Sequence, residues 1–280
     1  TIPEWDSVGH MSLIAELEEA FDIMMEMDDI IDLEIEKIDL ILSKINADPE
    51  SKEIKLVERQ LWEKIREKSI QGRRTGIGIT AEGDMLAALG LRYGSEDAIT
   101  FSTEVHKLLA IEVYRASVDL AEERGSFEIF DVTREIDNPF IKRIKKFAPH
   151  VYDKMLKVGR RNISMLTIAP TGSISICAQT TSGIEPVFMV SYKRRRKVNP
   201  NDKNVVVSFV DELGDAWEEY NVFHSKFETW LKINGYSIEE VKIKPEEELN
   251  KIIEQSPYYN ATSTDIDWVN KVKMQGEIQK

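Results

Sequence analysis

Residues 162–188, NISMLTIAPTGSISICAQTTSGIEPVF, carry the most informative signal in the chain. The segment 162–168 is apolar and rich in residues that favour strands, which predicts a buried β-strand. The turn Ala169-Pro170-Thr171-Gly172-Ser173 follows, and the Ser/Ile/Ala run after it predicts a short helix. The first N–H groups of such a helix have no partners within it, so the turn could bind an anion such as phosphate.

The same residues also fit an ordinary strand–turn–helix junction, in which Thr171 or Ser173 caps the helix. Junctions of this kind are common in α/β proteins, so spacing alone does not choose between the two interpretations. The turn lacks the Gly-Lys-Ser/Thr of a Walker motif, so an NTPase is not indicated.

Composition limits the possible classes of protein. The 280 residues include 37 Lys and Arg against 50 Asp and Glu, and the net charge of −13 argues against a broad surface for nucleic acid or anionic membranes. No apolar run approaches the roughly 20 residues that span a bilayer. The single cysteine, Cys177, excludes an internal disulfide and fits a reducing cytoplasm. Because the chain starts without Met and ends in a helical pattern without a cap, we expect a fragment of a longer protein.

The periodicity of apolar residues predicts a long first helix over residues 12–46. Asp28 falls inside its apolar stripe, where an acid is costly unless it is bonded. We expect Asp28 to bond a neighbouring backbone group or an arginine; alternatively it lies at a rim or in a solvated cluster with Asp29 and Asp32. A di-metal carboxylate bundle would need Glu-x-x-His pairs, which the sequence lacks, and the histidines and Cys177 have no metal-binding spacing.

Strands and helices are predicted to follow in an α/β order. A second helix over 52–69 has one apolar side, with Ile54, Val57 and Leu61. A strand is predicted over 75–80, where bare glycines indicate packing against a neighbouring element more than ligand contact. Helices are expected over 82–89, 96–124, 140–147, 151–158, 223–235, 245–255 and 265–280. The strand–helix–helix–strand order is typical of parallel strands.

Five consecutive cations, KRRRK, occupy residues 193–197. They suggest a phosphate-binding patch beside the turn, a nucleic-acid site, or a loop that pairs with the many surface acids. A nucleic-acid site would show strongly salt-dependent affinity, and the overall charge disfavours it. Turn residues follow, and Val205, Val206 and Val207 suggest a strand, so we expect a peripheral basic hairpin over about 192–222.

The segments TIAPTGSIS and SGIEPVF closely resemble the large, catalytic subunit of ribonucleotide reductases, in particular the adenosylcobalamin-dependent class II branch. GRRTGIGITAEGDMLAALGLRYGSEDA and DWVNKVKMQGEIQK resemble the same family in the same order. The resemblance implies an α/β fold: the C-terminal part of a ribonucleotide reductase-type α/β barrel, helix-rich, with parallel strands inside and helices outside. Residues 1–280 would be one partial barrel domain of an oxidoreductase that converts ribonucleoside diphosphates to 2′-deoxyribonucleoside diphosphates by radical chemistry.

The resemblance also assigns roles to the turn. It implies that backbone N–H groups and the two hydroxyls hold the substrate's diphosphate, with flanking residues on either side. The implied substrate-binding residues are Ala169, Pro170, Thr171, Gly172, Ser173 and Ile174. No catalytic residue is implied, because the family's radical cysteine lies on a separate loop, and we expect Cys177 to be a small buried hydrophobe.

The implied cofactor is adenosylcobalamin, and the implied partners are a ribonucleoside diphosphate, the N-terminal half of the reductase, a thioredoxin-type reductant and a second copy of the full enzyme. The sequence has no Asn-Pro-Cys-Gly-Glu loop and no redox cysteine pair, so we expect the chain to be inactive alone. The alternative is a non-catalytic nucleotide- or phosphate-binding or assembly module. Base preference, allosteric effectors, oligomeric state and the choice between a natural split product and a truncation stay open.

Overall fold

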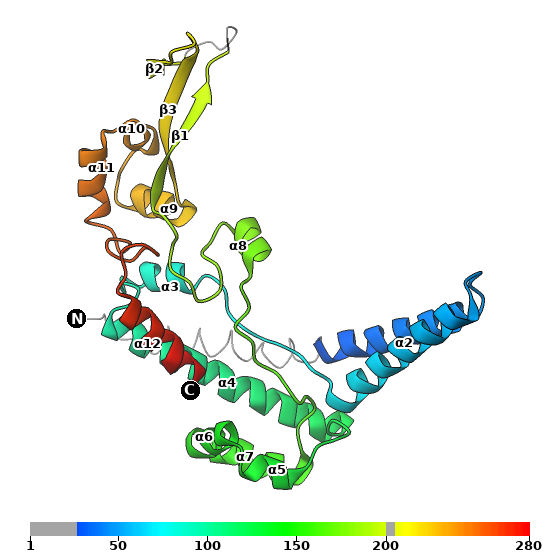
Figure 1. Cartoon of the computed structure of the whole chain (residues 1–280). Helices are drawn as coiled ribbons and strands as arrows, with labels where there is room; N and C mark the ends of the chain where they lie inside the picture. The colour runs from blue at the N-terminus through cyan, green and yellow to red at the C-terminus, as the bar shows by residue number, and fades with distance from the viewer. Residues whose placement is uncertain (1–26, 200–204) are drawn as a thin grey trace. The chain divides into compact units, whose positions relative to one another are not determined.

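The chain is rich in helix and contains a small sheet (Figure 1). The computed structural model describes residues 27–199 and 205–280. These residues form two compact units, which we describe separately. Unit 1 takes in the chain up to Ile77, the segment Glu104–Thr167 and Lys280, and unit 2 takes in Gly78–Thr103 and Ile168–Gln279. The predicted helix-rich character is confirmed.

Unit 1 is built from helices. The described part of the predicted first helix is helical over residues 27–45, and residues 12–26 of that prediction lie outside the described residues. The other helices that contribute to it are α2 (Lys52–Gly72), α4 (Glu96–Arg124), α5 (Val132–Ile136), α6 (Pro139–Phe147) and α7 (Pro149–Val158). Ser51 caps α2 and Asn138 caps α6, each accepting a hydrogen bond from a backbone N–H of the first turn.

Asp28 is fully buried, and arginines surround it. Its carboxylate lies 2.6 Å from Nε of Arg73, 2.9 Å from Nε of Arg161 and 3.4 Å from Nη1 of Arg124. Burial on its own would raise the pKa of Asp28, but the hydrogen bonds and charges of Arg73 and Arg161 outweigh it and lower the pKa below its usual value. The prediction that Asp28 bonds an arginine is confirmed.

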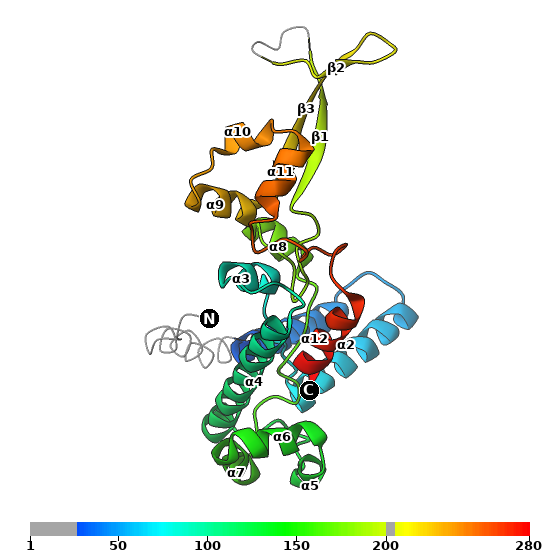
Figure 2. The same cartoon turned by 90° about the vertical axis from the view of Figure 1, so that its left-hand side faces the viewer.

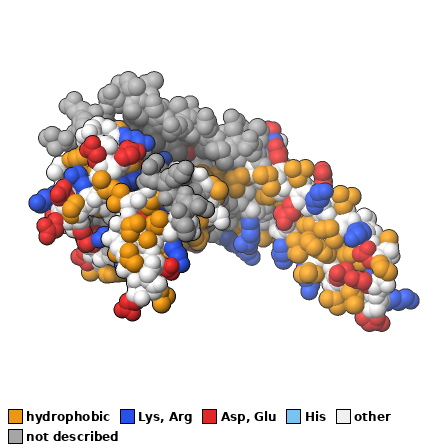
Figure 3. All heavy atoms as spheres, turned by 90° about the horizontal axis from the view of Figure 1, so that it is seen from above, with side chains coloured by type: hydrophobic (Ala, Val, Ile, Leu, Met, Phe, Trp, Pro, Cys, Tyr) orange, Lys and Arg blue, Asp and Glu red, His pale blue; other side chains and the backbone are white. Residues whose placement is uncertain are grey.

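The apolar side of α2 is not covered within the described residues. Ile54, Val57 and Leu61 are 50%, 66% and 55% exposed, and Gly72 is the one buried residue of the helix. Figure 3 shows hydrophobic side chains, mixed with charged ones, at the surface of α2 and the helix over residues 27–45. The amphipathic spacing of this helix therefore indicates which side is apolar and not whether anything packs on it.

The two segments predicted as strands, 75–80 and 162–168, do pair in parallel, but over a short distance. The N–H of Ile77 donates to the carbonyl of Met165, and the N–H of Thr167 donates to the carbonyl of Ile77. A single bridge between Ile77 and Leu166 results, and Ile168 is exposed, so the prediction of a continuous buried strand was wrong. Gly76 faces Thr167, which agrees with the expected packing between neighbouring elements. This bridge is the only parallel pairing in the described part of the chain, so the expected barrel is not visible there.

Unit 2 combines helices with a three-stranded antiparallel sheet of order β1-β3-β2. Strands β1 (Ser191–Lys197) and β3 (Ala216–Phe223) lie side by side (Figure 2), and β2 (Phe209–Val210) pairs with the other edge of β3. Val205, Val206 and Val207 are described and are not in a strand. The helices are α3 (Glu82–Ala88), α8 (Gly172–Ala178), α9 (Ser225–Ile233), α10 (Ile238–Lys242), α11 (Glu246–Ile253) and α12 (Trp268–Gln279).

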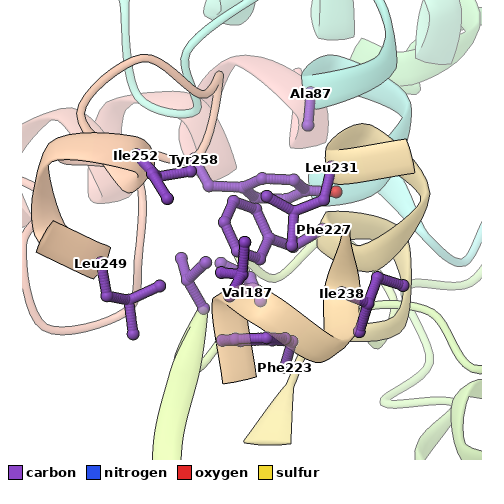
Figure 4. Close-up of a cluster of buried hydrophobic side chains, with 11 residues drawn as sticks. Ala87, Val187, Phe223, Phe227, Leu231, Ile238, Leu249, Ile252 and Tyr258 are labelled. Carbon is purple, nitrogen blue, oxygen red and sulfur yellow. The ribbon is translucent and has the colours of Figure 1, made fainter. Parts of the chain in front are cut away.

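One apolar cluster holds α3, the end of β3 and helices α9, α10 and α11 together (Figure 4). Phe227, which is fully buried, lies at its centre and makes edge-to-face contacts with Phe223 and Tyr258. Val187, from the SGIEPVF segment, is a member of the same cluster. This core therefore anchors the segment that follows α8.

The cations of the basic run project from β1 and meet acids. Arg195 lies 2.6 Å from Glu219, and Arg196 lies 2.8 Å from Glu218. Lys197 lies 2.5 Å from Asp215. These contacts agree with the expectation that the run pairs with surface acids, and binding to nucleic acid through it stays a hypothesis.

Candidate functional site

The turn before α8 has an unusual backbone conformation at Thr171. Its φ of 51° and ψ of 29° place it in the left-handed region. A β-branched residue is rarely found there because its side chain crowds the backbone. Such strain persists only where surrounding interactions impose it, and it often marks a functional segment.

The Thr171 hydroxyl supplies those interactions. Its Oγ1 accepts a hydrogen bond of 2.7 Å from the backbone N–H of Gly183 and lies 2.8 Å from Oγ1 of Thr80. The Gly183 N–H also lies 3.3 Å from Oγ1 of Thr80. The residue just before α8 is therefore held to two separate segments of unit 2.

Gly183 approaches the turn so closely that only glycine fits. Its φ is +47°, and a Cβ there would lie 2.8 Å from the carbonyl oxygen of Ala169. Any other residue would both strain the backbone and collide with the turn. Ser182 strengthens the contact, because its Oγ lies 2.7 Å from Oγ of the buried Ser175 in α8.

The first turn of α8 is open to solvent. The helix begins with the bond from the Ser175 N–H to the Thr171 carbonyl, and no side chain caps it. The N–H groups of Gly172, Ser173 and Ile174 have no acceptor inside the helix. These three residues are exposed, and a Cβ at Gly172 would meet nothing within 4 Å. A charged oxygen could therefore approach the helix start directly.

The structure thus brings the six predicted residues together at one place. Pro170, Gly172, Ser173 and Ile174 are exposed, and Ala169 and Thr171 are half-buried. The alternative that Thr171 caps the helix is wrong, because its side chain makes no cap hydrogen bond and points to Gly183 and Thr80 instead.

Comparison with known proteins shows which family the chain belongs to. The model of the family "Ribonucleotide reductase, barrel domain" matches residues 52–280. The chain belongs to this family. The matched range contains the turn, α8 and the segment up to Phe188, so the resemblance noted from the sequence is confirmed.

Similar proteins in the ribonucleotide reductase family carry two kinds of name. The chain is 33% identical over 138 residues to the vitamin B12-dependent ribonucleoside-diphosphate reductase of Mycobacterium tuberculosis, an alignment that covers 49% of this chain and 17% of the relative. It is 33% identical over 132 residues to the protein of the same name from Thermoplasma acidophilum, covering 47% and 15%. It is 30% identical over 142 residues to the ribonucleoside-diphosphate reductase subunit alpha of Chlamydia pneumoniae, covering 44% and 14%. The alignments therefore cover less than a fifth of the length of each of these three relatives.

One cluster near the reductase turn was not predicted from the sequence. The carboxylate of Asp84 in α3, which is 7% exposed, lies 2.7 Å from Nε2 of His224 and accepts from the Tyr258 hydroxyl at 2.9 Å. Its other oxygen accepts from the backbone N–H of Thr181 at 2.8 Å. The signal from which it could have been found is the segment EGDMLAA, where an acid stands among small and apolar residues.

Glu82 is a second buried acid of α3. Burial raises its pKa to about 7, and a hydrogen bond with Ser102 opposes that shift. Its backbone N–H donates to the carbonyl of Gly183 at 3.2 Å. Both ends of the segment 181–183 are therefore bonded to α3.

Cys177 is exposed, so the expectation of a small buried hydrophobe was wrong. Cys177 lies in α8, a short helix in which Ser175 is the one buried residue.

Among the described residues, no group of three or more His, Cys, Asp or Glu side chains could hold a metal ion. The described part of the chain also contains no helix with the length and apolar character needed to cross a membrane.

Proposed function

We propose that this chain is the part of a ribonucleoside-diphosphate reductase that holds the substrate's phosphates, through the turn formed by residues 169–174. In the proposal, the N–H groups of Gly172, Ser173 and Ile174 donate to diphosphate oxygens. The whole enzyme would reduce ribonucleoside diphosphates to the deoxy form in the cytoplasm, with the radical chemistry and the reductant supplied by parts of the enzyme outside this chain.

One observation carries the proposal: an uncapped, solvent-open helix start, preceded by a strained residue that is tied in place, within a chain of the reductase family. The N–H groups and the local dipole of a helix start favour a negative charge. A turn fixed before the ligand arrives loses little entropy on binding, and fixing the phosphates would orient the ribose.

The hydroxyl of Thr171 can also serve the phosphate if its hydrogen bonds are arranged in one way. Either of the Thr80 and Thr171 hydroxyls can be the donor in the contact between them. If Thr80 donates, Thr171 accepts from both Thr80 and Gly183, and its own O–H is free to donate to a phosphate oxygen. The exposed Ser173 would supply the second hydroxyl.

Adenosylcobalamin enters the proposal through the names of the relatives and not through residues of this chain. Cobalamin carries the equatorial ligands of its cobalt in its own corrin ring, so it needs no cluster of metal-binding side chains from the protein. We assign the cofactor to the whole enzyme and derive no step through it.

The alternative is a nucleotide- or phosphate-binding or assembly module without a role in turnover. Both proposals require phosphate binding, so reductase activity separates them. If the chain, combined with a polypeptide that contains the family's radical-cysteine loop, gives cobalamin-dependent formation of deoxyribonucleotide, the reductase proposal stands. Binding without turnover in such an assembly would favour the module.

Binding itself is tested by Gly172→Asp, measured by calorimetry with ADP, CDP, GDP and UDP in turn. An aspartate at the first position of α8 is compatible with the helix, because a negative charge there interacts favourably with the positive end of the helix dipole. The same charge repels a diphosphate. Gly276→Asp is a matched control, since Gly276 is also an exposed helical glycine with open space at its Cβ. We expect Gly172→Asp to abolish binding and Gly276→Asp to leave it unchanged; equal affinity in both variants would refute the loop's role.

A further inference from the structure

We propose that Asp84 is a positioning residue for the phosphate-binding turn and acts through the segment 181–183. This inference rests on the proposed function, because it assumes that the turn binds the phosphates of a ribonucleotide. It adds a residue from α3 that does not itself touch the turn.

The first step connects Asp84 to Thr181. Oδ2 of Asp84 accepts a hydrogen bond of 2.8 Å from the Thr181 N–H, and the Asp84 N–H donates to Oγ1 of Thr181 at 3.3 Å. Both residues are buried. This reciprocal pair fixes Thr181 against the start of α3, and a hydrogen bond to a buried carboxylate is stronger than one between neutral groups.

The second step connects the segment after Thr181 to the turn. Ser182 meets Ser175 of α8 at 2.7 Å, and the Gly183 N–H donates to Oγ1 of Thr171 at 2.7 Å. Gly183 also lies too close to Ala169 for any side chain. Because Thr171 is held in a strained conformation by these bonds, a small displacement of Thr181 changes the turn directly.

The third step explains what holds Asp84 itself. Oδ1 lies 2.7 Å from Nε2 of His224 and accepts from the Tyr258 hydroxyl at 2.9 Å. A carboxylate only accepts, so Nε2 of His224 carries a proton in this arrangement. His224 directly precedes α9, and Tyr258 belongs to the apolar cluster around Phe227. The carboxylate therefore faces donors on both oxygens and has one orientation.

A positioning role and a purely structural role predict different results for Asp84→Asn. The amide keeps the size of the side chain but puts an NH2 group on one of its two sides, so either the Thr181 N–H or both His224 and Tyr258 lose their acceptor. A structural role would lower the stability of unit 2 and leave phosphate affinity unchanged once the protein is folded. A positioning role would weaken the binding of diphosphates selectively.

The test uses the full 280-residue chain, titrated with ADP, CDP, GDP and UDP and with the four nucleosides, and measures hydrogen exchange at the Gly183 N–H. We expect Asp84→Asn to weaken diphosphate binding about tenfold, the equivalent of one lost charge-assisted hydrogen bond. Nucleoside binding should not change, and exchange at Gly183 should become faster. Asp211→Asn is the control, because Asp211, at the turn between β2 and β3, also accepts from three donors: Trp217 Nε1, Leu213 N and Asp215 N.

The outcomes separate the two proposals. If the unaltered chain binds none of the diphosphates, the proposed function fails. If the unaltered chain binds them, and a folded Asp84→Asn variant binds equally well with unchanged exchange at Gly183, the positioning role is wrong. Should Asp84→Asn fail to fold, His224→Gln and His224→Leu take its place: the positioning role requires weaker diphosphate binding in the Leu variant and rescue in the Gln variant, which keeps a donor, and equal binding in both would overturn it.

Discussion

The backbone N–H of Gly183 donates a hydrogen bond of 2.7 Å to the hydroxyl of Thr171, and this contact ties the SGIEPVF segment to the turn before α8. The two segments that most resemble ribonucleotide reductases are therefore in direct contact. The bond holds a β-branched residue in the left-handed region, so the shape of the turn depends on it.

Thr171→Val tests that bond, because valine keeps the branched shape and removes the hydroxyl. The Gly183 N–H would lose its best acceptor, and we expect a loss of about 1–3 kcal/mol in the free energy of unfolding. Urea unfolding of the 280-residue chain measures it. Thr171→Ser, which keeps the hydroxyl, should lose less than half as much; equal losses would show that the hydroxyl does not hold the turn.

Gly183→Ala tests the close approach to Ala169. A Cβ would lie 2.8 Å from the Ala169 carbonyl oxygen, and the φ of +47° is itself unfavourable for alanine. Gly214→Ala is the control, since Gly214 has a φ of +86° and nothing within 4 Å of its Cβ. We expect about 1 kcal/mol for Gly214→Ala from the backbone alone and clearly more for Gly183→Ala. Thermal unfolding of both variants decides, and equal losses would contradict the steric contact.

Asp28→Asn tests the buried ion cluster of unit 1. Removing one partner of a buried charge pair leaves the arginines uncompensated, and we expect a loss of about 3 kcal/mol. Asp39→Asn should lose clearly less stability than Asp28→Asn, because its pair with Arg66 is exposed. The pKa of Asp28 is lowered in the fold, so its stabilising effect is present above the unfolded pKa of about 3.9 and is lost as the pH falls through the lower folded value. An Asp28→Asn variant that unfolds in acid with the unaltered pH dependence would argue against this cluster.

Glu82→Gln tests the buried acid of α3, and the sign of its pH dependence is opposite. The folded pKa of Glu82 is about 7, above the unfolded value, so the folded chain holds the proton more tightly. Its stabilising effect is complete below about pH 4.3 and is lost as the pH rises through about 7. The free energy of unfolding of the unaltered chain should therefore fall between pH 5 and 8, and that of the Glu82→Gln variant should fall less, as measured by urea unfolding. The same change at the exposed Glu247 should leave the decline in place.

Some local features could be predicted from the sequence, but tertiary pairing and exposure could not. The short helix after Ser173 and the contact of Asp28 with an arginine could both be predicted, because each depends on local spacing or on one unavoidable electrostatic need. The length of the parallel pairing at Ile77 could not, since strand propensity does not say how many residues find a partner. The exposure of Cys177 depends on tertiary packing in the same way.

The site shows the same division. The six turn residues lie together because they are consecutive in the sequence. The contacts that hold the turn in place do not follow from the local sequence. Thr80 and Gly183 reach Thr171 from 91 and 12 residues away in the sequence, and His224 reaches Asp84 from 140 residues away. No local pattern encodes such contacts, although the acid in the segment EGDMLAA is a signal from which a buried partner for Asp84 could have been predicted.

The most direct test of the proposed phosphate binding by the turn is the amide NMR spectrum of the chain during titration with a ribonucleoside diphosphate. We predict that the N–H signals of Gly172, Ser173 and Ile174 shift together and saturate, that inorganic pyrophosphate shifts them in the same direction, and that the nucleoside without phosphates does not shift them. Signals at these three residues that stay in place while others move would contradict the account.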